Sequence, residues 1–155
     1  MMFRLAAALL LIAGLAAAPA ALGQDAPLSK LEPVTVATDL GATMFTAEIA
    51  DTEPLRERGL MFRQRLPEDR AMLFDFEAPR AVAMWMKNTL IPLDMVFIRK
   101  DGVVAYVAEN TVPGSLDAVG VQEPIRAVLE VAGGTAKRIG LRSGDRVYHR
   151  IFPAD

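Results

Sequence analysis

The sequence contains no cysteine and only one histidine, His149. Without thiolates the chain cannot form a disulfide or a thiolate metal site, and one imidazole is too few nitrogen ligands for a zinc centre. A serine triad would have to combine His149 with Ser115 or Ser143, and neither serine lies in a sharp nucleophile turn. These absences favour a non-enzymatic protein that uses no metal or other cofactor.

An excess of positive charge is also missing. The chain has 17 Lys and Arg against 19 Asp and Glu, so it offers no electrostatic attraction for nucleic acid or for an acidic membrane surface. Gly133 and Gly134 lack the spacing and the following lysine of a phosphate-binding loop. We therefore expect neither a nucleic-acid nor a nucleotide partner.

The first 23 residues have the pattern of an export signal. Arg4 precedes an apolar run from Leu5 to Ala18, and small residues occupy the two positions before Gln24 that a signal peptidase recognises. The run is shorter than the roughly 20 residues needed to cross a bilayer. We expect a signal peptide over residues 1–23, a mature protein in the periplasm or secreted, and no membrane anchor after cleavage.

The rest of the chain has the patterns of one β-rich domain. Residues 24–32 form a polar linker, and residues 33–155 form a single domain. Two short helices are expected, from the Asp51 or Thr52 cap to Gly59, and over 135–141 with Thr135 as cap. Apolar alternation predicts strands over 34–38, 43–50, 71–76, 82–87, 93–99, 103–109, 125–131 and 146–152. The fold class is mainly β, an antiparallel β-sandwich or a barrel-like fold with two short helices.

Residues 82–99 contain the densest apolar run outside the leader, together with Trp85, the only tryptophan. Their pattern predicts a hairpin of strands 82–87 and 93–99 around the loop 88–92. Period-two alternation then places Trp85 with Met95 and Phe97 on one face, and Asp94 with apolar neighbours on the other. Trp85 is expected to be buried, so that Trp85→Ala would cost roughly 3–5 kcal/mol.

Asp94 and a group of arginines are the candidate ligand-binding residues. A carboxylate on an apolar face must be paired or hydrogen-bonded, and the nearest partners in sequence are the amides of 88–91, including Asn88, and the ammonium of Lys87. A structural role is favoured for Asp94. Arg58 and Arg63, with Arg65, could bind an anion, although the acids among them favour a solvated surface of mixed charge. The irregular segment 110–124 is either a plain connection or a ligand-contacting loop.

Two alternatives with a defined chemistry remain open. Met84 and Met86 would present two thioethers on one strand face, which suits Cu(I) with His149 as a third donor, although core packing is the commoner role of methionine. A hydrolase acting on carbohydrate or cell-envelope material would need two carboxylates, one of them Asp94, in the same cleft.

Several motifs resemble a known family. They are GLMFR at 59–63, MLFDF at 72–76, WMKNTLIPLDMVFI at 85–98, VLEVAGG at 128–134 and GLRSGDRV at 140–147. Together they resemble the domain-of-unknown-function 192 family over residues 34–152, with Met84 standing where that family usually has an aromatic residue. The resemblance implies a compact β-sandwich-like fold and no defined reaction. We therefore expect an exported binding or accessory module for an unknown small molecule or envelope component.

Overall fold

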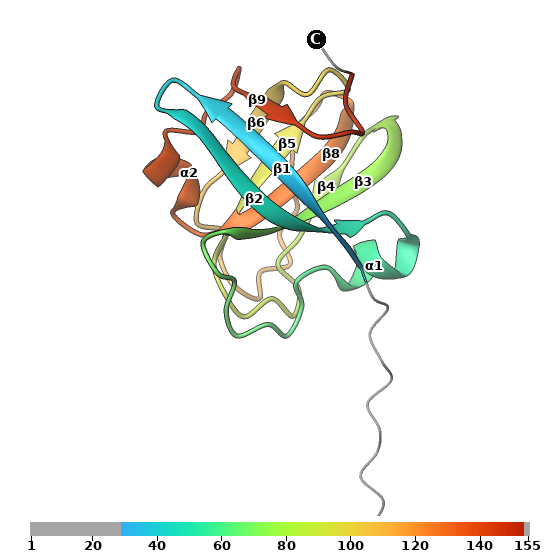
Figure 1. Cartoon of the computed structure of the whole chain (residues 1–155). Coiled ribbons are helices and arrows are strands. Elements are labelled where there is room, and N and C mark those ends of the chain that lie inside the picture. The colour runs from blue at the N-terminus through green and yellow to red at the C-terminus, as the bar shows by residue number, and fades with distance from the viewer. Residues whose placement is uncertain (1–28, 154–155) are drawn as a thin grey trace, which may run out of the picture.

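The computed structural model describes residues 29–153 and is mainly β (Figure 1). It contains two short helices, α1 (Glu53–Arg58) and α2 (Thr135–Ile139). Its strands are β1 (Lys30–Thr38), β2 (Gly41–Ala50), β3 (Arg70–Arg80), β4 (Ala83–Met84), β5 (Leu93–Ile98), β6 (Val104–Ala108), β7 (Val119–Gly120), β8 (Ile125–Ala132) and β9 (Arg146–Tyr148).

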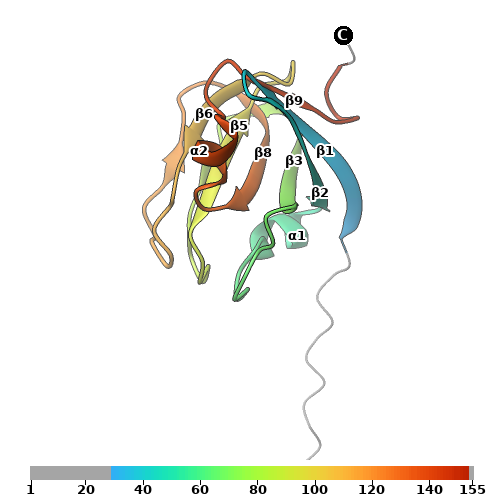
Figure 2. The ribbon, with the colours of Figure 1, turned by 60° about the vertical axis from the view of Figure 1, so that its left-hand side comes forward.

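Seven of the strands form one curled sheet in the order β6-β5-β8-β3-β2-β1-β9, while β4 and β7 pair separately. Neighbours in the large sheet are antiparallel except β2 and β3, which are parallel. The sheet curls until β9 meets the chain just before β6, where the Val147 amide donates to the Gly102 carbonyl at 2.8 Å. The expected barrel-like class is therefore confirmed, as a half-closed barrel (Figure 2).

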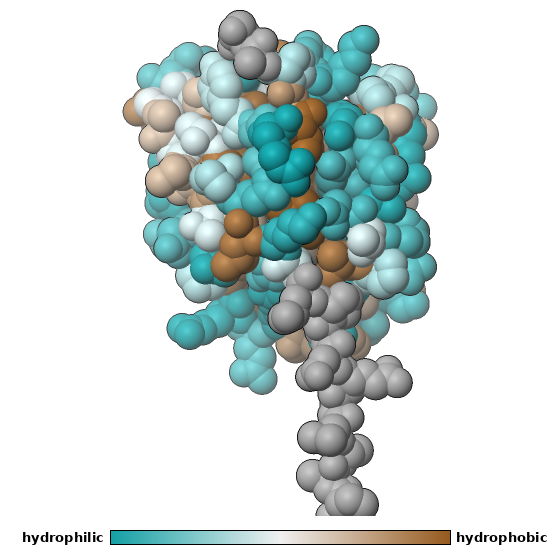
Figure 3. Space-filling view, turned by 45° about the vertical axis from the view of Figure 1, so that its right-hand side comes forward, coloured by the Kyte–Doolittle hydropathy of each residue, from teal (hydrophilic) through white to brown (hydrophobic). Residues whose placement is uncertain are grey.

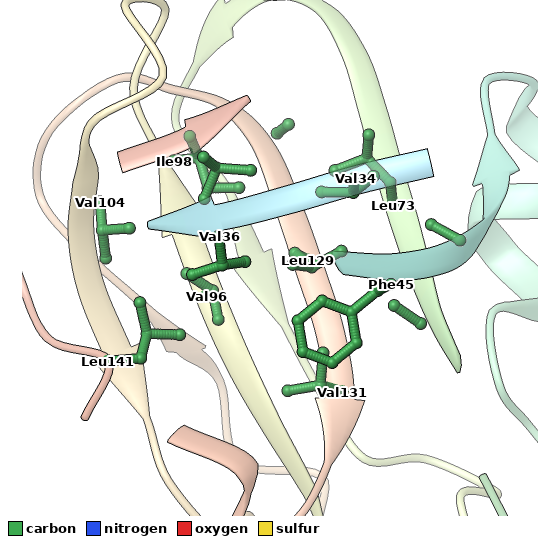
Figure 4. Close-up of a cluster of buried hydrophobic side chains, with 14 of the residues drawn as sticks. Val34, Val36, Phe45, Leu73, Val96, Ile98, Val104, Leu129, Val131 and Leu141 are labelled. Carbon is green, nitrogen blue, oxygen red and sulfur yellow. The ribbon is translucent and has the colours of Figure 1, made fainter. Parts of the chain in front are cut away.

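Alternating side chains of the curled sheet build two hydrophobic clusters, one on each face. The first lies inside the curl, where Val36 and Phe45 of the β1–β2 hairpin lie against Val96 and Val131 of β5 and β8 (Figure 4). The second covers the other face, beneath α1 and the segments that contain β4 and β7. Both faces of β5, of β8 and of the first half of β3 are thus buried, which explains the mostly apolar sequences of these stretches.

The outer surface is less apolar than these clusters. On the side where the chain enters β1, hydrophobic residues lie in narrow strips between hydrophilic ones rather than in one broad patch (Figure 3). Within residues 29–153, no helix is both long and apolar enough to pass through a membrane. The expected signal peptide and its cleavage site lie outside the described residues.

The predicted hairpin of 82–87 and 93–99 is wrong. β4 is only two residues long and pairs with β7, and β5 instead pairs with β6 on one edge and β8 on the other. An apolar run predicts a strand but not its partner, and here a strand from far along the chain occupies the edge of β5. The face assignment within β5 is confirmed, because Leu93, Met95 and Phe97 belong to the second cluster and Val96 and Ile98 to the first.

Several element boundaries also differ from the prediction. β1 begins at Lys30 rather than 34, so the expected linker enters the sheet. β3 continues to Arg80 rather than ending at 76, and β9 ends at Tyr148 rather than at 152. The N-cap of α2 is Gly134, not Thr135, and its φ of 86° requires the left-handed conformation that glycine adopts readily.

Candidate functional site

A cleft of about 510 Å³ opens between α1, the outer face of β3 and β8, and the segment 80–89. Its floor contains Glu130 from β8 and Phe74 from β3. Apolar side chains of Leu60, Met61 and Met84 line its walls, and charged groups surround its mouth. Concave sites with mostly apolar walls and a few polar groups are where small ligands usually bind.

The end of α1 brings one wall close to the floor. Pro54 lies in the first turn of this helix, and Gly59 ends it with φ 46° while its amide donates to the Leu55 carbonyl. A Cβ atom at Gly59 would lie 3.1 Å from the Phe74 ring. The sequence therefore needs glycine here both for the backbone angle and for the close approach of helix and floor.

A hydrogen bond between two residues in the left-handed backbone conformation joins two walls of the cleft. Phe62 has φ 64° and Asn88 has φ 55°, and the Phe62 amide donates to the Asn88 carbonyl at 2.8 Å. Bulky aromatic residues rarely adopt this conformation, and such strain persists only where surrounding contacts hold it. The contact fixes the turn after α1 against the 86–89 turn, and so fixes the width of the cleft.

Glu130 is the most unusual residue of the cleft. Only 4% of it is exposed, and its carboxyl group has no hydrogen-bond or ion-pair partner among residues 29–153. β8 pairs with β3 and β5 on its two sides, which places Glu130 between Met72 and Met95. Burial raises the pKa of Glu130 to about 8, so the carboxyl group is largely protonated at neutral pH.

Sequence reasoning missed Glu130 because it treated β8 as a strand with one solvent-facing side. Alternation of Arg126, Val128 and Glu130 agrees with that picture. In the structure both faces of β8 are covered, because its alternating side chains belong to the two hydrophobic clusters on opposite faces of the sheet. The signal that could have indicated a site is a single acid inside an otherwise apolar run, VLEVA.

Three cations at the mouth have no ion-pair partner within the described chain: Arg58, Arg80 and Lys87. The Arg80 guanidinium lies 4.8 Å from the centre of the Phe76 ring, and the Lys87 ammonium lies 4.9 Å from that of the Trp85 ring. Arg56 differs, because it bonds Glu53 at 3.1 Å and donates to the Asp75 carbonyl at 2.7 Å. Arg58, Arg80 and Lys87 are therefore available to an anion.

Trp85 is half-exposed, with 50% of its surface accessible, so the expectation of a buried tryptophan is wrong. β4 ends at Met84, and the chain then turns at 86–89 instead of continuing as a strand on the Met95 face. Trp85 lines the cleft instead. A half-exposed tryptophan beside a cleft is a surface on which a flat ligand can stack.

Trp85→Ala is accordingly expected to lower the free energy of unfolding by less than about 1 kcal/mol, because little of the ring leaves a packed interior. Phe97→Ala, at a fully buried aromatic of the same molecule, is the matched comparison and should cost about 3–5 kcal/mol. Urea unfolding of both variants measures the difference. A loss at position 85 close to that at position 97 would contradict the exposed position of Trp85.

Comparison with known proteins identifies the family but no activity. The model of the DUF192 family, described as an uncharacterized ACR, matches residues 34–149. The chain belongs to the DUF192 family. No curated protein matches it.

Two solved structures resemble this DUF192 chain over most of their length. A protein from Sinorhizobium meliloti described as a candidate transcription regulator is 42% identical, with a TM-score of 0.78 over 81% of this chain and 98% of its own. A protein of unknown function from Novosphingobium aromaticivorans is 38% identical, with a TM-score of 0.77 over 86% of this chain and 94% of its own. These similarities support the half-barrel fold.

Asp94 of this DUF192 domain is buried and structural, but its predicted partners are wrong. Its carboxylate accepts the amides of Asn110 at 2.8 Å, Gly134 at 3.1 Å and Ala136 at 2.7 Å, and it touches neither the 88–91 amides nor Lys87. These donors come from the segment after β6 and from the start of α2. Asp94 thus joins segments far apart in the sequence, inside the curl and on the opposite face from Glu130.

The other predicted site residues separate into two groups. Arg58 and Lys87 both line the cleft. The Arg63 guanidinium instead donates two hydrogen bonds, of 2.6 and 2.7 Å, to the Glu48 carboxylate of β2. This ion pair lowers the pKa of the Glu48 carboxyl. Asn88 supports the neighbouring turn through its carbonyl and does not line the cleft.

The segment 110–124 contains β7 and does not line the cleft. Part of it borders a second hollow of about 390 Å³ together with residues 81–83. The Met86 amide donates to the Ser115 carbonyl at 3.0 Å, so this segment supports the turn that carries Lys87. Of Asp94, Lys87, Arg58 and this segment, only Lys87 and Arg58 therefore line the cleft.

The structure does not assemble the proposed copper ligands. Met86 is buried in the second cluster and accepts a hydrogen bond from the Thr111 hydroxyl at 3.1 Å, and Met84, which lines the cleft, packs against the same cluster. His149 lies just after β9, where its Nε2 atom is 3.0 Å from Glu32, and burial lowers its pKa. Between residues 29 and 153, no cluster of three or more His, Asp or Glu side chains is placed to hold a metal.

Proposed function

We propose that this protein is an exported binding module that holds a small anionic molecule with a flat apolar ring in the α1–β3–β8 cleft. The observation that carries the proposal is a set of three cations around a cleft with apolar walls, Arg58, Arg80 and Lys87, none of which has an ion-pair partner among residues 29–153. Export rests on the charge and apolar pattern of residues 1–23.

The charges at the mouth favour an anion on physical grounds. Arg80 and Lys87 are already held over aromatic rings, so less side-chain freedom is lost when they bind. A carboxylate or phosphate could accept hydrogen bonds from the Arg58 guanidinium as well. The ligand's ring would then lie beside Trp85 and the apolar walls, where its burial from water contributes affinity.

A hydrolase of carbohydrate or envelope material is the second candidate, and it rests on the carboxylates of the cleft. Glu130 is protonated, as a general acid must be, and Glu57 is exposed at the mouth with no ion-pair partner in the described part of the chain. Sugar recognition requires many hydrogen bonds, whereas the walls provide only the Thr89 hydroxyl besides the charged groups. We therefore rank binding of an apolar anion above hydrolysis of a sugar polymer.

The binding proposal is tested with Trp85 as an intrinsic probe, because it is the only tryptophan. Titration with 4-acetylbenzoate should change the Trp85 fluorescence and saturate. Arg58→Gln combined with Lys87→Gln should weaken this binding at least tenfold, because two of the three cations of the mouth are removed. Isothermal titration calorimetry gives the same constants independently of the fluorophore.

The matched control is Arg65→Gln combined with Lys100→Gln. These two cations are exposed and unpaired within the described residues, but neither lines the cleft. The control variant has the same net charge as the test variant, so its affinity should stay within twofold of the unaltered protein. Equal weakening in both variants would mean that general charge, not the cleft, attracts the anion, and would refute the proposed site.

A further inference from the structure

The carboxyl group of Glu130 makes no hydrogen bond or ion pair that would stabilise the described fold. It is nearly fully buried, it reaches the cleft, and it bonds no group of residues 29–153. Other buried acids are satisfied: Asp94 accepts three amides, and Asp75 pairs with Arg126. An unpaired polar group in such a position normally costs stability, so a partner from outside the chain would explain it.

The charged groups that share the cleft do not ionise Glu130. They come from α1, from the end of β3 and from the turn after β4, and burial alone accounts for the raised pKa of the Glu130 carboxyl. The strand neighbours on β3 and β5, Met72 and Met95, carry no charge. The charged residues lining the cleft with Glu130 are Glu53, Arg56, Glu57, Arg58, Arg80 and Lys87.

We propose that Glu130 binds the ligand in its protonated form, as a hydrogen-bond donor to an acceptor oxygen at the end of the ligand remote from its anionic group. The inference rests on the proposed function, since the anionic end is assigned to the cations of the mouth. It defines the ligand class as an aromatic acid that carries a carbonyl or ether oxygen across the ring.

An aromatic ring fits the cleft better than a sugar does. The walls between Glu130 and the mouth include Phe74, Phe76, Met61, Met84 and Trp85, which provide apolar surface, and their one uncharged side-chain hydroxyl is that of Thr89. A sugar would leave several of its hydroxyl groups unpaired there, which is unfavourable. A flat ring loses nothing in this environment and gains contact with the side chain of Trp85.

The test compares the pH dependence of binding of two probes, 4-acetylbenzoate and benzoate. The acetyl oxygen only accepts hydrogen bonds, so 4-acetylbenzoate should bind well at pH 6 and about tenfold more weakly at pH 9, where most of the Glu130 carboxyl has lost its proton. Benzoate lacks the acceptor, so it should bind more weakly at pH 6 and change less than threefold with pH.

Glu130→Gln and Glu130→Leu separate the donor from the shape of the side chain. The glutamine amide still donates but does not titrate, so this variant should bind 4-acetylbenzoate within threefold of the unaltered protein at pH 6 and should keep that affinity at pH 9. Leucine cannot donate and should bind about tenfold more weakly at both pH values. Glu109→Gln, at an exposed glutamate that lies outside the cleft and has no ion-pair partner between residues 29 and 153, should keep the original pH dependence.

The possible failures are distinguishable. If 4-acetylbenzoate binds through Arg58 and Lys87 but with the same affinity from pH 6 to pH 9, the proposed function stands and the role of Glu130 is refuted. Loss of the pH dependence in Glu109→Gln as well would also refute it. If neither probe binds, both proposals fail.

Discussion

Asp94→Ala is expected to lower the free energy of unfolding by about 3–5 kcal/mol, a large part of the stability of a domain of this size. The change removes the acceptor of three amides, from Asn110, Gly134 and Ala136, and leaves donors in a region where Asp94 itself is fully buried. Urea unfolding at pH 7, followed by circular dichroism, measures the loss.

Two further variants test the cause of that loss. Asp94→Asn keeps one acceptor oxygen and the side-chain volume but turns an amide group toward one of the donors, so an intermediate loss is expected. Asp69→Ala, at an exposed aspartate whose side chain has no partner among residues 29–153, should change stability by less than about 0.5 kcal/mol. A midpoint for Asp94→Ala at or above that of the unaltered protein would overturn the structural role.

Glu130→Gln is expected to have an effect of comparable size and opposite sign, which appears only at higher pH. Glutamate in an unfolded chain ionises near pH 4.5, whereas the buried Glu130 carboxyl has a pKa of about 8. Between these values the native state holds a proton that the unfolded state has released, so stability falls as the pH rises. The contribution is fully present below pH 4.5 and is lost by pH values above 8.

Because one pKa unit corresponds to about 1.4 kcal/mol, the unaltered protein should lose on the order of 3–4 kcal/mol relative to Glu130→Gln between pH 5 and pH 8. Other titrating groups, such as His149, are present in both proteins and cancel in the difference. Urea unfolding at several pH values measures it, with Glu109→Gln as the control that should follow the unaltered protein. Parallel curves for the unaltered protein and Glu130→Gln would mean that the carboxyl group is not desolvated.

The variants at Asp94 and Glu130 distinguish the roles of two buried acids that look alike in the sequence. Replacing Asp94 removes a group that stabilises the fold. Replacing Glu130 removes a group that lowers the free energy of unfolding at neutral and higher pH. A native residue that lowers the stability of its own fold is typical of a binding or catalytic site. The opposite signs of the two expected effects therefore bear directly on where the function of this protein lies.

The sequence by itself determined most of the strands, both helices and the family. Apolar alternation identified β5 and its two faces, and Gly59 correctly ended α1. These features depend on side chains within a few residues of one another. Local patterns record them because backbone geometry and solvent exposure act on neighbouring residues.

Tertiary structure alone decided which strands pair and which acid faces a cleft. β8 pairs with both β3 and β5, and the side chains of the second cluster and the segments packed over them bury the face on which Glu130 lies. The same arrangement brings the amides of α2 to Asp94 and leaves Trp85 beside the cleft rather than in the core. Pairing between strands far apart depends on the packing of the whole sheet, and no short stretch of sequence specifies it.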